Sequence, residues 1–144
     1  MLTMNKLFEI AIKKFSKRNN VFLLSEGRPS GGLENWLQWE LIEALEDEGF
    51  RTDLKGKVAK GCDIIVDNEI GVELRAASDG NLNYLEKATK DHPNANLYLF
   101  TFWNRKGANT QEIFEKYLSN EGFLFLSAPL TPSMILLVAE RSRI

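Results

Sequence analysis

Residues 61–75 constrain the fold of this chain more than any other stretch. Two runs rich in β-branched residues flank the polar segment 67–69, a pattern that predicts two antiparallel strands joined by a tight turn. If the turn takes these three residues, Val66 faces Ile70 across the hairpin. One face is then wholly apolar and carries Cys62, Ile64, Val66, Ile70, Val72 and Leu74.

The same register brings two carboxylates together on the other face, where Asp63 is opposite Glu73 and Arg75 lies beside them. Directly opposed residues of an antiparallel pair have Cβ atoms roughly 4.5–5.5 Å apart, so the two negative charges repel each other. A divalent metal ion between them would offset this repulsion, and carboxylate oxygens suit Mg²⁺ or Mn²⁺. Two simpler interpretations stay open. In the first, Asp63 is an exposed residue at the start of a strand. In the second, Glu73 and Arg75, two positions apart on one face, form a surface ion pair with neighbours, worth ~0–1 kcal/mol.

Composition indicates one globular domain spanning residues 1–144. A chain of 144 residues is long enough to bury a core, and its single cysteine excludes an internal disulfide. No stretch is long and apolar enough to cross a bilayer, and the first residues lack the layout of a secretion signal. We therefore expect a cytoplasmic protein without membrane contact. The net charge of −2 does not by itself indicate a nucleic-acid-binding protein.

Hydrophobic periodicity and breaker residues divide the chain into alternating helices and strands. Helices are expected at 3–17, 33–48, 82–90 and 110–118. Strands are expected at 21–24, 50–54, 96–103, 123–126 and 135–139, in addition to the hairpin. Gly49 and Gly122 are placed to end the second and last helices. This alternation predicts an α/β sandwich around one mixed sheet.

A basic stretch leads directly into Asp63 and contains Lys55, Lys57 and Lys60. Such a cluster is either a solvated surface or a contact for phosphate groups. Its position in the sequence, immediately before the candidate metal ligand, favours the second interpretation as much as the first.

This order of elements, with its acidic residues, resembles the PD-(D/E)XK nuclease superfamily, which includes restriction enzymes, Holliday junction resolvases and RecB-type nuclease domains. The family core is a helix bearing a glutamate, a three-strand meander, a second helix and a further strand. Asp63 matches the aspartate that starts the second strand. Glu73-Leu74-Arg75 matches the (D/E)xK tripeptide of the third, with arginine in place of lysine. The resemblance covers residues 33–103, and the flanking elements would be additions to this core.

The resemblance implies a restriction endonuclease-like sandwich and Mg²⁺- or Mn²⁺-dependent hydrolysis of phosphodiester bonds in DNA. Asp63, Glu73 and the Leu74 carbonyl would bind the ion, and Arg75 would neutralise charge on the phosphate. Lys55, Lys57 and Lys60 would contact nucleic acid, and Lys57 or Lys60 would substitute for the missing lysine. A homodimer is also expected, since many family members cut two strands as dimers.

The helix glutamate of the family has two candidates in the 33–48 helix. Glu34 lies on the stripe that Leu37, Leu41 and Leu45 define as buried, whereas Glu40 lies off its centre. We expect Glu34 to complete the site, with Glu40 as the reserve. The alternative is that Glu34 only favours the positive end of its helix.

Two rival functions stay open, and Arg75 motivates the first of them. Because arginine stays protonated, it supplies only the electrostatic part of what a lysine does, so a catalytically degenerate module that binds nucleic acid or a protein partner is the alternative. A structural α/β domain whose basic N-terminal helix mediates assembly is a more distant third.

Two further residues have structural expectations. His92 is expected to be a helix-end residue, and Cys62 a buried apolar one.

Overall fold

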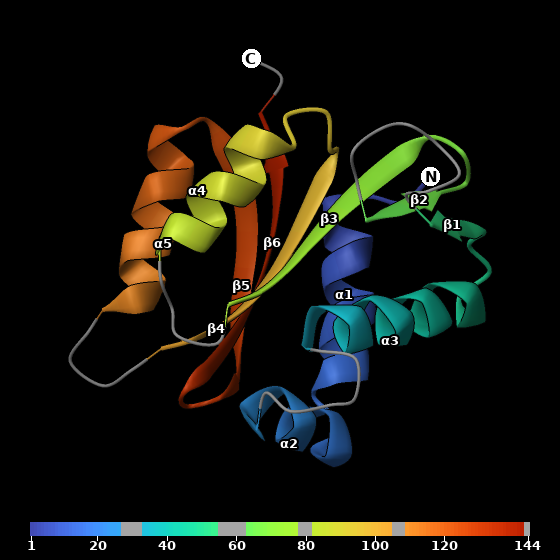
Figure 1. Ribbon diagram of the computed structural model, residues 1–144, viewed down its shortest axis with the longest axis horizontal. Helices are drawn as coiled ribbons and strands as arrows, with labels where there is room; N and C mark the ends of the chain where they lie inside the picture. The colour runs from blue at the N-terminus through green and yellow to red at the C-terminus, as the bar shows by residue number, and fades with distance from the viewer. Residues whose placement is uncertain (27–32, 55–62, 78–81, 105–108, 143–144) are drawn as a thin grey trace.

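The computed structural model describes residues 1–26, 33–54, 63–77, 82–104 and 109–142 (Figure 1). Its helices are α1 Met4–Phe15, α2 Arg18–Glu26, α3 Leu33–Asp47, α4 Leu82–Asp91 and α5 Thr110–Asn120. Its strands are β1 Thr52–Leu54, β2 Ile64–Val66, β3 Ile70–Ala77, β4 Leu97–Trp103, β5 Phe123–Thr131 and β6 Met134–Arg141.

The strands form one six-stranded mixed sheet in the order β1-β2-β3-β4-β6-β5. Strands β3 and β4 are parallel and are connected through α4, while every other neighbouring pair is antiparallel. Helices α1 and α3 cover one face of the sheet, and α4 and α5 cover the other (Figure 1). The expected mixed α/β class is confirmed.

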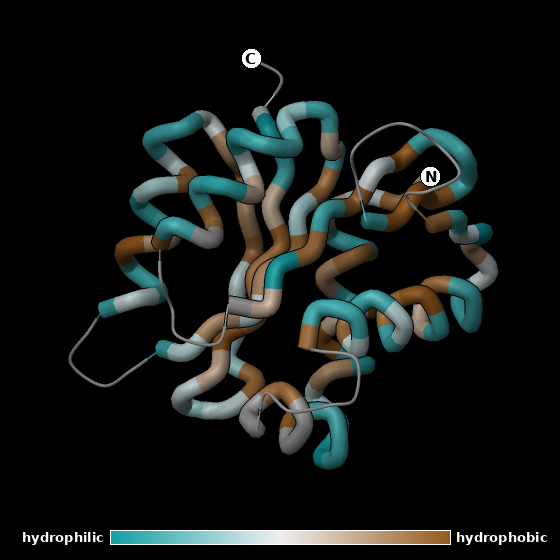
Figure 2. The backbone as a smooth tube through the Cα atoms, in the orientation of Figure 1, coloured by the Kyte–Doolittle hydropathy of each residue, from teal (hydrophilic) through white to brown (hydrophobic). Residues whose placement is uncertain are grey.

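Each face of the sheet has its own hydrophobic core, because strand side chains alternate between the two faces. The α1/α3 core includes Leu7, Phe15, Leu37, Leu41, Leu45, Ile64, Val72, Leu74, Leu97 and Leu99. The α4/α5 core includes Ile65, Leu85, Ala88, Tyr98, Phe100, Phe102, Phe114, Leu118, Ile135 and Leu137. Figure 2 shows hydrophobic residues concentrated along the central strands and hydrophilic ones around the outside.

The hairpin has the register that its sequence predicts. Ile64 pairs with Val72, and Val66 with Ile70, so the turn takes residues 67–69. Asp67 and Asn68 have φ angles of 52° and 61° in this turn, a left-handed conformation that short polar side chains tolerate well. The expected facing of Cys62 and Leu74 involves a residue outside the described part of the chain.

One expected strand is wrong. Residues 21–24 belong to α2, which begins just after α1 ends. A run of four apolar residues does not distinguish a short strand from a helical turn. The helix places Leu24 in the α1/α3 core, and the Asn20 side-chain amide donates to the Lys14 carbonyl at 2.7 Å, so α2 is fixed against the end of α1.

The two C-terminal strands exist but are longer than expected. Pro129 lies inside β5, where it accompanies a shift in register against β6. Proline cannot donate to a strand ladder and is therefore confined mainly to edge strands, which is the position of β5. Gly49 and Gly122 end their helices with φ angles of 90° and 79°, as expected of glycines at helix C-termini.

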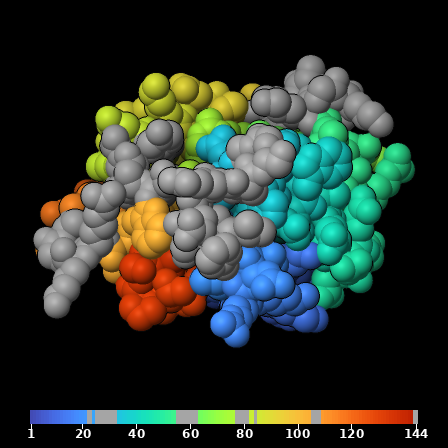
Figure 3. All heavy atoms as spheres, turned by 60° about the horizontal axis from the view of Figure 1, so that its bottom comes forward, coloured from blue at the N-terminus to red at the C-terminus, as the bar shows by residue number. Residues whose placement is uncertain are grey.

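A buried lysine joins the two helices of the α1/α3 layer. Lys14 of α1 lies 2.5 Å from the Glu43 carboxylate and 3.2 Å from that of Glu40, both on α3. Burial alone would lower the pKa of Lys14, but the hydrogen bonds and charges of the two glutamates outweigh this effect and raise it. Figure 3 shows α3 (cyan) beside the blue α1 and α2.

Candidate functional site

Glu73 is a buried carboxylate in the middle of β3. Its neighbours Val72 and Leu74 lie in the α1/α3 core, so the Glu73 side chain points to the α4 side of the sheet. Only 1% of Glu73 is exposed. An ionised carboxylate at such a position requires charged or hydrogen-bonding partners, because removing it from water costs several kcal/mol.

Arg75 and His92 supply partners to this carboxylate. Arg75 Nη1 lies 2.5 Å from Glu73 Oε2 and donates to the Leu74 carbonyl at 3.0 Å. His92 Nε2 lies 3.3 Å from both Glu73 Oε2 and Arg75 Nη2. Glu73 and Arg75 therefore form an ion pair, as one interpretation of the sequence expected, but its carboxylate is buried and its guanidinium is half-buried.

His92 has a contact that the sequence analysis missed. The residue does follow the end of α4, as expected. Because β3 and β4 are parallel, the connecting helix runs back over β3 and brings His92 to Glu73, 19 positions earlier in the chain. The strand–helix–strand pattern at 70–103 was the signal that could have revealed this contact, because a parallel crossover covers its first strand with the helix.

Asp63 reaches the same part of β3 from the neighbouring strand. It stands just before β2, outside the ladder, and its Oδ2 accepts a hydrogen bond from the Leu74 amide at 2.9 Å. This bond places the Asp63 carboxylate beside the residue that follows Glu73. The side chain is half-buried.

The two candidate helix glutamates have different surroundings. Glu34, in the first turn of α3, is exposed, and its Oε1 accepts from the Ala76 amide at 3.4 Å. Glu40 faces α1 and lies 3.2 Å from Lys14. Glu34 is therefore the helix carboxylate that the fold brings to β3.

Three carboxylates thus lie along β3 between Glu73 and Ala76: Glu73 of the strand itself, Asp63 of the segment before β2, and Glu34 of α3. Carboxylate and carbonyl oxygens are a donor set that suits Mg²⁺ or Mn²⁺. As the side chains stand, however, no three His, Cys, Asp or Glu residues in the described part of the chain are grouped closely enough to bind an ion. Binding an ion here would require these carboxylates to move closer together.

The predicted nucleic-acid contacts cannot be located relative to these carboxylates. Lys55, Lys57 and Lys60 lie in the segment 55–62, outside the described residues. The basic stretch is adjacent to Asp63 in sequence, and this adjacency remains the basis of the prediction.

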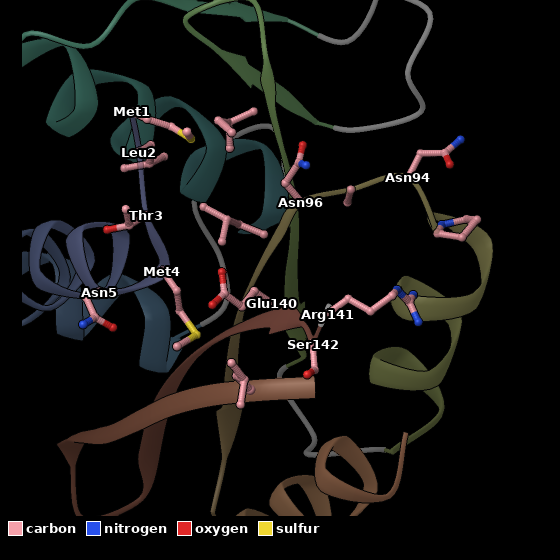
Figure 4. Close-up of a pocket in the computed structure, with 15 residues that line it drawn as sticks. Met1, Leu2, Thr3, Met4, Asn5, Asn94, Asn96, Glu140, Arg141 and Ser142 are labelled. Atoms are coloured by element: carbon pink, nitrogen blue, oxygen red, sulfur yellow. The ribbon is translucent and has the colours of Figure 1, made fainter. Parts of the chain in front are cut away.

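An open groove of about 900 Å³ lies away from this site (Figure 4). It is formed by the start of α1, the start of β4 and the adjoining ends of β5 and β6, and it meets β3 only at Ile70. Arg141 points out of it toward α4, where it donates to the Thr89 carbonyl at 3.1 Å. None of the predicted site residues within the described part of the chain lines the groove.

None of the described helices is long and apolar enough to span a bilayer. Comparison of the chain with family models, with curated proteins and with solved structures found no match.

Proposed function

We propose that this protein is a metal-dependent nuclease that hydrolyses phosphodiester bonds in DNA, with its active centre at residues 73–76 of β3. The observation that carries the proposal is that Asp63 and Glu34 each accept a hydrogen bond from a backbone amide of this short stretch of β3, which itself carries Glu73. Glu73 is 1% exposed, and a carboxylate buried to this extent requires cationic or hydrogen-bonding partners, a requirement that a bound metal ion would share with Arg75.

The topology around these residues supports the same proposal. Helix α3, the meander β1–β3, helix α4 and strand β4 follow the order that the PD-(D/E)XK resemblance implies. Asp63 immediately precedes the second strand of this meander, and Glu73 lies in the third. A restriction endonuclease-like architecture is therefore part of the proposal.

Asp63 and Glu73 would hold the ion, together with the Leu74 carbonyl. A bound divalent ion activates water as a nucleophile and stabilises charge on the phosphate and the leaving oxygen. Arg75 stays protonated at any physiological pH, so its role is to provide charge and hydrogen bonds to the phosphate. Its bond to the Leu74 carbonyl fixes the guanidinium beside the carboxylates. Glu34 would position groups at the exposed end of the site.

One observation favours a second candidate, a catalytically degenerate module that binds nucleic acid or a protein partner. The guanidinium of Arg75 already neutralises Glu73, with His92 alongside. A permanent cation at this position takes over the structural role that a metal ion would otherwise have. In that case the fold is retained and hydrolysis is lost.

The two candidates are separated by incubating plasmid DNA with the protein in Mg²⁺ or Mn²⁺, with EDTA as the metal-free control. A nuclease nicks or linearises the plasmid only with metal, and Asp63→Asn and Glu73→Gln each abolish cleavage. Glu69→Gln, in the exposed turn of the same hairpin, is the matched control and retains activity. Full cleavage by both site variants would exclude this centre.

The binding module predicts a different result in the same samples. The DNA stays intact, but its mobility shifts, and the shift weakens as salt increases. Replacing Lys55, Lys57 and Lys60 by glutamine reduces the slope of log affinity against log salt by roughly one per lost phosphate contact. A single-stranded RNA competitor shows whether the surface prefers DNA.

A further inference from the structure

Strand β5 is an edge strand with little of the usual protection against pairing. Its nine residues, Phe123–Thr131, carry no charge. The opposite edge, β1, has only three residues and includes Asp53. Edge strands are normally protected by shortness, charge or proline. Strand β1 has two of these features, whereas β5 has only Pro129, near its end.

The backbone groups that β5 turns away from the sheet can be identified. The Ser142 amide donates to the Gly122 carbonyl at 2.7 Å, while Phe123 faces Arg141. Phe123 and Arg141 are therefore a non-hydrogen-bonded pair, and Leu124 is the first β5 residue whose amide and carbonyl face β6. By alternation, the amides and carbonyls of Phe123, Phe125 and Ser127 face outward. No described residue forms a hydrogen bond with these outward groups.

Pro129 is the next outward position, and it has no amide hydrogen to offer. The register shift between Pro129 and Thr131 also bends this end of the strand. The part of the edge that is open to pairing is therefore residues 123–128.

We propose that this edge pairs antiparallel with the same edge of a second copy of the chain, about a two-fold axis at Phe125. Phe125 then faces Phe125 of the second copy, and Phe123 faces Ser127. Each of these facing pairs exchanges both of its backbone hydrogen bonds. The two sheets become one continuous sheet, and the contact is closed because both copies use the same surface.

The side chains of β5 favour a second copy over a charged partner. In the proposed register Leu124 faces Leu126 of the second copy, so an aliphatic pair covers the exposed Leu124, of which 53% is accessible in one copy. No like charges meet across the axis, since 123–131 contains none. Cross-strand apolar pairs of this kind stabilise a sheet.

The apolar surface also continues beyond the strand. Leu124 lines the 900 Å³ groove. Met1 and Met4, before and at the start of α1, line it as well (Figure 4). Met1 is 81% exposed. A second copy that pairs with β5 lies next to this groove, so the contact includes side chains as well as the strand edge. The proposal does not depend on hydrolytic activity.

The test measures the mass of the full chain by light scattering after gel filtration over a range of concentrations. The wild type is expected to approach twice its 16.4 kDa as concentration rises. Leu124→Lys, an exposed position on the pairing edge, is expected to stay at the monomer mass. Ile113→Lys on α5, 47% exposed in the wild type, is the matched control and dimerises as the wild type does.

Amide hydrogen exchange locates the contact. The Phe125 and Ser127 amides of the wild type are expected to exchange more slowly as the dimer forms, and this readout does not require any variant to fold. A wild type that stays monomeric at every concentration overturns the proposal. A dimer whose Phe125 and Ser127 amides exchange at the monomer rate also overturns it, because its interface then lies elsewhere.

Discussion

The Leu74 amide donates a hydrogen bond to the Asp63 carboxylate at 2.9 Å, and this bond joins a loop residue to the strand that carries Glu73. The bond has a structural role, since it continues the contact between β2 and β3 past the end of their ladder. The same oxygen would be a metal ligand in the proposed nuclease. Stability and activity at Asp63 therefore have to be separated by choice of variant.

Asp63→Asn and Asp63→Ala make this separation. Asparagine retains an oxygen that can accept from the Leu74 amide, so its free energy of unfolding should lie within about 0.5 kcal/mol of wild type. Alanine leaves the amide without this acceptor and should cost about 1–2 kcal/mol. Both variants should lose metal-dependent cleavage. Urea denaturation measures the first effect, and equal losses of stability in both variants would contradict the role of the hydrogen bond.

Local sequence pattern predicted most of the fold because its signals were redundant. The hairpin 61–75 combined β-branched residues, alternation and a polar turn, and its register is as expected. The 33–48 helix had an apolar stripe and a terminal glycine. The 21–24 segment had only four apolar residues, and nothing in so short a window distinguishes a strand from a helix.

The site was less predictable because its contacts are distant in sequence. The hairpin register could place Asp63 near Glu73, since only ten positions separate them. The contact of His92 with Glu73 depends on the path of the chain through α4 and β4. The choice of Glu34 over Glu40 followed from helical periodicity, and the pairing of Glu40 with Lys14 adds a reason from packing.

The Lys14–Glu43 pair should make stability depend on pH in the acid range. The hydrogen bond from Lys14 lowers the pKa of Glu43 below its ordinary value of 4.5, so the pair stabilises the fold above that value and loses its contribution as pH falls through the lowered pKa. The raised pKa of Lys14 acts in the alkaline range. The stabilisation that Lys14 contributes to the fold is complete below pH 10.5 and is lost as pH rises through the raised folded-state pKa.

Glu43→Gln should therefore be less stable than wild type at neutral pH, and the difference should shrink in acid, below pH 4.5. Glu112→Gln, at an exposed position on α5, is the matched control and should show a small difference at both pH values. Thermal unfolding at several pH values measures this. A Glu43→Gln difference that stays constant into strong acid would show that the carboxylate charge is not involved.

Gly49 and Gly122 offer a test of backbone strain without steric clash. Their φ angles are 90° and 79°, and a Cβ atom added at either position would meet nothing within 4 Å. Alanine at either position should therefore cost about 1–2 kcal/mol through the left-handed backbone alone. Urea denaturation measures the loss, and stability equal to wild type would show that the helix ends can relax into another conformation.

The buried ion pair between Glu73 and Arg75 allows the two candidate functions to be compared through stability. Arg75→Met removes the cation nearest to a carboxylate that is 1% exposed, and breaking such a pair from one side costs about 3 kcal/mol. Adding Glu73→Met removes the buried charge, so the double variant should be more stable than Arg75→Met alone. Urea denaturation of the two single variants and the double variant measures this coupling.

The effect of Mn²⁺ on the melting temperatures of the wild type and these variants distinguishes the two candidate functions. If Asp63 and Glu73 bind a divalent ion, Mn²⁺ competes with Arg75 for the Glu73 carboxylate, so it should raise the melting temperature of Arg75→Met more than that of the wild type. The Glu73→Met variant should show no such rise. An equal, negligible response in all of them would favour the binding module, in which Arg75 has permanently taken the place of the ion.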